Sequence, residues 1–158
     1  MNFPILSSLI LLPVVGSLFL LFSKDKNSNT GKYVALFTSF VNFLISIYLW
    51  YQFDPTTSDF QFVEDREWLK GFINYKVGID GISILFIVLT SLITPLCIIS
   101  VNNTVKDRLR DFLIAILVME SLMIGVFCSL DLVIFYLFFE AGLIPMFLII
   151  GIWGGARR

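Results

Sequence analysis

Two carboxylates inside long apolar runs are the first sign of chemistry in this sequence. Glu120 lies in the run from 112 to 130, and Glu140 lies in the run from 132 to 153. An acidic residue near the centre of a bilayer costs roughly 2.5–3.5 kcal/mol on translocon scales, so membrane helices rarely carry one without a function. Such residues are typical of a path for protons or cations.

The spacing predicts that both glutamates lie at nearly the same depth. Only Ser129 to Asp131 separates the two runs, which predicts a tight hairpin of antiparallel helices, with Asp131 capping the second helix. Counted from Asp131, Glu120 and Glu140 are roughly 16 Å and 13 Å deep, at 1.5 Å of rise per residue. Both are therefore expected near the midplane of a hydrocarbon layer about 30 Å thick.

Pro145 follows Glu140 by five positions. Because proline has no N–H, the carbonyl of Ala141 loses its partner and the helix is predicted to kink there. The small residues Ala141 and Gly142 let water or another helix approach. We interpret Glu140 as a proton-binding site beside this turn. Glu120 is either a second proton site or a structural acid hydrogen-bonded to a neighbouring helix, and a structural role stays open for Glu140 too.

The composition places these acids in a polytopic membrane protein. Of 158 residues, 58% are hydrophobic and 15% are charged, whereas soluble domains have about 25% charged residues. Five runs approach the roughly 20 residues that a spanning helix needs. We therefore predict an all-α fold with helices at about 3–22, 33–53, 82–101, 112–130 and 132–153. The first run lacks the leading positive charge of a signal peptide, which favours a retained helix over a cleaved one.

Basic residues indicate how the chain crosses the membrane. Eight of the eleven lie in the first loop, the third loop and the tail: Lys24, Lys26, Lys32, Lys106, Arg108, Arg110, Arg157 and Arg158. Short loops rich in Lys and Arg stay on the cytoplasmic or matrix side. This predicts an N-terminus outside and a C-terminus inside. The outer loop 54–81 then contains an alternating stretch at 59–62, which predicts a short strand. We interpret this loop as a flap over the helix ends with Trp68 at headgroup level, a ligand site being the alternative.

Several functions are not expected. The chain has no histidine, and Cys97 and Cys128 form no paired motif and are expected to be buried thiols. No nucleotide loop, metal-ligand cluster or activated nucleophile is present, and a net charge of −1 gives no indication of nucleic-acid binding. A buried acid usually pairs with a cation, but no predicted helix carries Lys or Arg in its interior. That partner is expected from another segment or subunit.

Several segments resemble one family of membrane proteins. The segment 77–83, VGIDGIS, resembles the signature before the third helix of subunit 4 of NADH dehydrogenase, called subunit M in bacteria. The segment 131–153 resembles the fifth helix of that family, and 151–154 resembles the usual end of that helix. The segments 52–55 and 61–64 resemble its first outer loop.

The resemblance implies a larger, antiporter-like subunit of complex I, the respiratory NADH:quinone (ubiquinone) oxidoreductase. Glu140 matches the family's main fifth-helix glutamate, which pairs with a lysine on the seventh helix, and Glu120 matches an accessory acid. NADH, FMN, iron–sulfur clusters and quinone would be bound by partner subunits. Expected partners are the other complex I membrane subunits and the lipid bilayer, in a bacterial plasma membrane or a mitochondrial inner membrane.

The resemblance also implies that the segment up to Arg158 is an N-terminal portion. The C-terminal helices with the lysine relay would then come from the same or a separate chain, and these five helices alone are not expected to move protons. Two alternatives remain: a subunit of a monovalent cation/proton antiporter, or a structural membrane piece without a transport role.

Overall fold

The computed structural model describes residues 4–22, 29–69, 73–101, 105 and 108–154. Its elements follow in the order α1 (Ile5–Phe22), α2 (Asn29–Gln52), β1 (Gln61–Leu69), β2 (Ile73–Ile79), α3 (Ser83–Ser100), α4 (Leu109–Cys128) and α5 (Leu132–Trp153). Each of these five helices is long and apolar enough to cross a membrane. The predicted all-α polytopic membrane fold is therefore confirmed.

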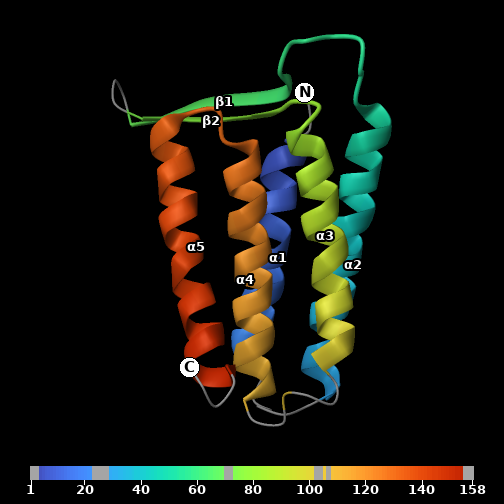
Figure 1. Ribbon diagram of the computed structural model, residues 1–158, viewed down its shortest axis with the longest axis vertical. Coiled ribbons are helices and arrows are strands. Elements are labelled where there is room, and N and C mark those ends of the chain that lie inside the picture. Colours follow the sequence, from blue (N-terminus) through green and yellow to red (C-terminus); the bar gives the residue numbers. More distant parts are fainter. Residues whose placement is uncertain (1–3, 23–28, 70–72, 102–104, 106–107, 155–158) are drawn as a thin grey trace.

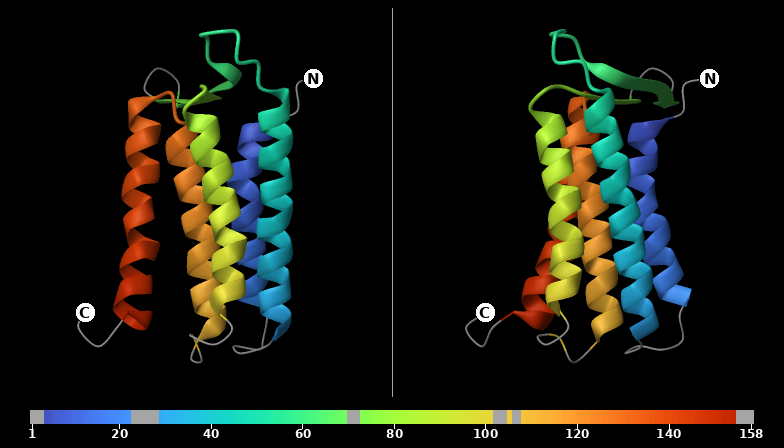
Figure 2. Two further views of the ribbon diagram at one scale, coloured as in Figure 1. Left: turned by 45° about the vertical axis from the view of Figure 1, so that its right-hand side comes forward. Right: turned by 90° about the vertical axis from the view of Figure 1, so that its right-hand side faces the viewer.

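The helices run side by side as one antiparallel bundle (Figure 1). Helix α4 is central and packs against α1, α3 and α5, with a smaller contact to α2. Helix α5 stands at the edge of the bundle, as Figure 1 and the left view of Figure 2 show. The start of α1 and the end of α5 lie at opposite ends, as an odd number of crossings requires. Which end faces outside stays a prediction.

Two helix starts differ from the predicted ones. Helix α2 begins at Asn29 rather than 33, and α4 begins at Leu109 rather than 112. In both cases the added turn is polar, and hydropathy detects only the part of a helix that lies in hydrocarbon. Helix α4 also ends at Cys128, two residues early, while α2 ends at Gln52, just before the predicted stop at 54–55.

The loop 54–81 forms a β-hairpin across the bundle end where α1 begins (Figure 2). The predicted strand at 59–62 was too short, because β1 extends to Leu69 and pairs antiparallel with β2. Val77 and Ile79 of β2 are fully buried in the apolar cluster of the helix ends. This confirms a flap over the helices. The side chain of Trp68 lies outside the described residues.

Glu64 of β1 ties the hairpin to α1. Its carboxylate accepts hydrogen bonds from the backbone N–H groups of Leu6 (2.9 Å) and Ser7 (3.3 Å) and from the Ser7 hydroxyl. A carboxylate at a helix N-terminus satisfies unpaired donors and interacts favourably with the helix dipole. The Tyr75 hydroxyl of β2 lies 3.2 Å from the Ser7 hydroxyl, and burial raises the pKa of Tyr75.

The segment 77–83 positions α3 and the hairpin. The Asp80 N–H donates to the Ser83 hydroxyl (2.8 Å), and the Ser83 N–H donates to the Asp80 carboxylate (2.7 Å), as in a capping box. The hydrogen bonds from Ser83 hold the pKa of Asp80 below its usual value. A Cβ at Gly78 would lie 2.6 Å from the end of the Leu130 side chain, so a larger residue here would require Leu130 to move from its place on the α4–α5 turn.

Two smaller predictions have different outcomes. Asp131 caps α5 as predicted, accepting hydrogen bonds from the N–H groups of Val133 (2.9 Å) and Ile134 (3.1 Å). Both cysteines are free thiols, and Cys128 is buried. The prediction of burial is wrong for Cys97, which is exposed on α3. An apolar run did not imply burial here, because Cys97 lies on a face of α3 that no described part of the chain covers.

Candidate functional site

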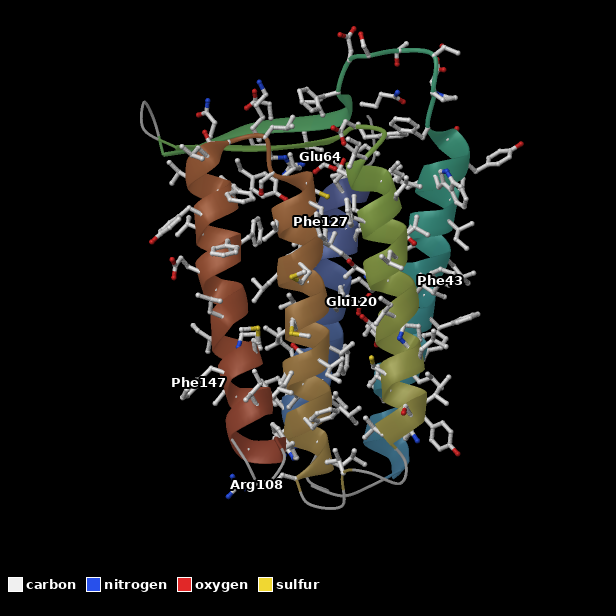
Figure 3. All side chains as sticks on the ribbon, viewed as in Figure 1. Phe43, Glu64, Arg108, Glu120, Phe127 and Phe147 are labelled. Carbon is white, nitrogen blue, oxygen red and sulfur yellow. The ribbon has the colours of Figure 1, made fainter. Side chains whose placement is uncertain are left out.

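Glu120 lies inside the bundle on the central helix α4. Figure 3 shows it near mid-height, between Glu64 at the hairpin end and Arg108 at the opposite end. Its side chain is 2% exposed. The Asn42 side-chain amide of α2 donates a hydrogen bond of 2.9 Å to Glu120 Oε1. The sequence analysis expected a partner on a neighbouring helix for a structural Glu120 but did not identify Asn42.

One oxygen of each member of this pair is left over. Glu120 Oε2 and Asn42 Oδ1 are buried and have no hydrogen-bond partner within the part of the chain that the structure describes. Glu120 is also the one acidic or basic side chain among the buried residues of that part. A buried polar atom without a partner costs free energy, roughly 1–3 kcal/mol. The pair is therefore incomplete as it stands.

The other buried polar side chains of the described residues all carry hydroxyl groups, and we call them the hydroxyl band. The buried members come from four helices and are Ser17, Thr38, Ser39, Ser46, Ser91, Thr94 and Ser121. The Ser46 and Ser91 hydroxyls lie 2.7 Å apart and connect α2 to α3. Ser121 donates to the Ile10 carbonyl and connects α4 to α1. The spacing of Ser39, Asn42 and Ser46 along one helix face is the sequence signal that would have located this band.

Glu140 lies in a different environment. It is eight residues from the start of α5, as Glu120 is eight residues from the end of α4, so both have the same distance from the hairpin. The Glu140 side chain is exposed. It lies in a surface groove lined by α5 residues alone: Leu137, Glu140, Ala141, Leu143, Ile144 and Phe147. The Tyr136 hydroxyl, one turn earlier, interacts with its carboxyl.

The structure thus keeps the two glutamates apart. They occupy adjacent helices at matching depth, but Glu120 faces the bundle interior and Glu140 faces away from the rest of the described chain. Helix α5 runs without a break through the buried Pro145, and the kink beside Glu140 stays a prediction. No set of three or more metal-ligating side chains occurs within residues 4–154 as far as they are described.

The two sides of α5 differ in packing. At the α4 interface, a Cβ added to Gly125 would meet the Phe138 ring at 2.6 Å, which marks close helix contact. Gly142 lies one turn after Phe138 on that same side, although an added Cβ there would meet nothing within 4 Å. On the opposite side, a Cβ at Gly151 would also meet nothing within 4 Å. This open face is strongly apolar, with Ile144 and Phe147 64% and 75% exposed. Glu140 therefore lies on a face that no described part of the chain covers.

Known proteins share this sequence over nearly its whole length. The chain is 47% identical over 97% of its residues to "NADH-ubiquinone oxidoreductase chain 4" of Marchantia polymorpha, and 58% identical over 85% to "NADH-quinone oxidoreductase subunit M" of Rhodobacter capsulatus. It is 44% identical over 100% to subunit M of Rickettsia prowazekii. Over these aligned regions the chain is similar to the subunit M/chain 4 family. No protein-family profile matches it.

The relatives are longer proteins. The chain spans 31%, 25% and 33% of the three subunit M/chain 4 relatives named above. The family resemblance inferred from the segments 77–83 and 131–153 is confirmed. The chain with this open α5 face thus corresponds to about a third or less of the length of each of these subunits.

Proposed function

We propose that this chain is part of a membrane subunit of respiratory NADH:quinone oxidoreductase and takes part in proton translocation. The observation that carries the proposal is the matched depth of two membrane-embedded glutamates, within a chain 44–58% identical to proteins named for this complex. NADH, FMN, iron–sulfur clusters and quinone would be bound by partner subunits. The relatives come from bacteria and plants, so a bacterial plasma membrane and a mitochondrial inner membrane both fit.

In this proposal Glu140 is the main proton-binding site. A carboxylate on a membrane helix needs water or a cation nearby to carry charge. The open face around Glu140, on which Ile144 and Phe147 are exposed, fits a covering segment that supplies a lysine. We assign that segment to the part of the family subunit beyond the matched third. Other membrane subunits of the complex would be further partners.

The test is Glu140→Gln in the full-length subunit within the intact complex. We expect proton translocation coupled to NADH oxidation to fall by about tenfold or more, the effect of a barrier raised by ~1.4 kcal/mol. The amount of assembled complex should stay unchanged, because Gln has nearly the same shape. Proton uptake into membrane vesicles and the abundance of the complex are the two measurements.

Leu143→Met is a matched control, since Leu143 lies in the same groove and the change alters no charge. It should leave translocation unchanged. Normal translocation in Glu140→Gln would refute the role of Glu140. Purification of the chain with a cation/proton antiporter that lacks NADH oxidation would refute membership of the complex.

A structural role for Glu120 is the second candidate, favoured by its hydrogen bond to Asn42. In that case Glu120→Gln would leave translocation intact, since Gln keeps an acceptor for the Asn42 amide. A double variant, Glu120→Gln with Glu140→Gln, that translocates protons normally would make the whole chain a structural membrane piece.

A further inference from the structure

We propose that Asn42 holds Glu120 in its neutral, protonated form, by closing a second hydrogen bond between the carboxyl Oε2–H and the amide Oδ1, directly or through one bound water. Asn42 is then a positioning residue for a proton on α4. The inference concerns one of the two acids of the proposed proton path. It describes where a proton is held and makes no use of translocation.

The hydrogen-bonding capacity of the two side chains depends on the protonation of Glu120. An ionised carboxylate only accepts hydrogen bonds, whereas a protonated one has a single O–H donor. Asn42 Nδ2 already donates to Glu120 Oε1 at 2.9 Å. The two atoms left without partners, Glu120 Oε2 and Asn42 Oδ1, are both acceptors while Glu120 is ionised. One hydrogen on Oε2 turns this mismatch into a donor and an acceptor.

The surroundings offer no substitute for that hydrogen. The buried polar groups of the described residues on α1, α2 and α3 are hydroxyls and the Asn42 amide, with no cationic side chain among them. The nearby hydroxyls already have partners. Thr38 and Ser39 donate to carbonyls of their own helix, and Ser46 pairs with Ser91. None of these groups neutralises an ionised Glu120.

A bound metal ion fits the pair less well than a proton. Hard cations such as Ca²⁺ and Mg²⁺ take about six or more oxygen ligands. Only two buried side-chain oxygens of the described residues are without partners. A single proton completes both of them, and a bridging water can carry the same hydrogen bond if Oε2 and Oδ1 are too far apart for direct contact.

Infrared difference spectroscopy of the intact complex, carrying the full-length subunit at neutral pH, tests the inference. The difference spectrum of wild type minus Glu120→Gln should contain the C=O stretching band of one protonated carboxylic acid. The band should shift to higher frequency in Asn42→Leu, because the acid loses its hydrogen-bonded partner. A water O–H band that disappears in the same variant would identify the bridged form, and its absence the direct one.

Ser39→Ala is the matched control. Ser39 is buried on the same helix, but its hydroxyl bonds to Leu36 of that helix, so the acid band should not move. Loss of an ionised carboxylate band in Glu120→Gln would overturn the inference. An unshifted acid band in Asn42→Leu would overturn the proposed role of Asn42 as the hydrogen-bond partner of the acid. If that variant does not assemble, Asn42→Ser replaces it, with the same two readings.

The outcome is independent of the translocation assay. A protonated Glu120 with normal translocation in Glu120→Gln would keep this inference and remove Glu120 from the proton path. An ionised Glu120 with impaired translocation would do the reverse.

Discussion

Glu120 and Glu140 are the same residue type, on neighbouring helices, eight residues from the same hairpin. Their surroundings nevertheless differ in almost every respect. Glu120 is 2% exposed and hydrogen-bonded to Asn42, in a core that also contains the hydroxyl band. Glu140 lies on an open, apolar helix face beside Tyr136. The comparison shows that spacing along the chain determines the depth of a side chain, while the helix face determines its environment.

The same contrast separates α5 from the other four helices. Helices α1 to α4 share a core in which buried polar side chains meet one another. Helix α5 buries only Ile134 and Pro145 among its described residues. Glu120, in the core, needs one hydrogen to complete its hydrogen bonds with Asn42. Glu140, on α5, needs a covering segment from outside the described residues. Two pairs of variants test this difference, and a third pair tests the cap of α3.

The largest expected change in stability is that caused by Glu120→Ala. The change leaves a cavity and removes the partner of the Asn42 amide, which should lower the free energy of unfolding by about 2 kcal/mol. Glu140→Ala is the matched change on the open face and should leave the stability of this chain unchanged. Thermal unfolding in detergent micelles measures both. Equal losses in the two variants would contradict the separation of core and open face.

Substitution by Ala should change the stability in opposite directions at Gly125 of α4 and at Gly142 of α5. Gly125→Ala places a methyl group against the Phe138 ring and should cost about 1–3 kcal/mol through overpacking. Gly142→Ala meets nothing and should stabilise α5 by up to about 1 kcal/mol through helix propensity. The same unfolding assay distinguishes them, and destabilisation by Gly142→Ala would mean that α5 is closely packed at Gly142.

Phe147, two turns after Glu140 on the same helix face, sharpens the comparison in the full-length subunit. Phe147→Ala should be tolerated by the present chain, where the ring is 75% exposed, but should reduce assembly of the complete subunit, where the proposed covering helices pack on this face. The measurement is the abundance of the assembled complex, and normal assembly would contradict a close covering segment at this position.

The smallest effect concerns the cap of α3 at the hairpin end. Asp80→Ala should cost about 1 kcal/mol, as is typical for the loss of a helix cap, whereas Asp59→Ala, in the exposed part of the loop, should cost nothing. The hydrogen bonds from Ser83 hold the pKa of Asp80 below its unfolded value. Its stabilisation is therefore present above about pH 4 and is lost as the pH falls through the folded pKa.

Asp80→Asn keeps a capping oxygen but cannot titrate. Its unfolding midpoint should therefore lack the part of the acid-side loss that Asp80 contributes in the wild type. Identical pH profiles for the wild type and Asp80→Asn would show that the cap is not charge-assisted.

Much of this protein follows from local sequence. Runs of apolar residues predicted five helices, because a bilayer requires about 20 such residues per crossing. Asp131 predicted the cap of α5, and the residue count predicted the equal depth of Glu120 and Glu140. These features depend on the chemistry of neighbouring residues along one chain. The extra polar turns of α2 and α4 were missed because hydropathy does not distinguish a helix in water from a loop.

The tertiary structure decided which side chains meet. Asn42 and Glu120 are 78 positions apart, and the sequence contains many polar residues on α2 that could have faced elsewhere. Glu64 reaches the start of α1 only because β1 and β2 pair and lie across the bundle. The outward direction of Glu140 depends on how α5 rotates about its own axis when Gly125 packs on Phe138. Because α5 is apolar on nearly all sides, its sequence marks no single face for the interior, and packing between helices determines that rotation.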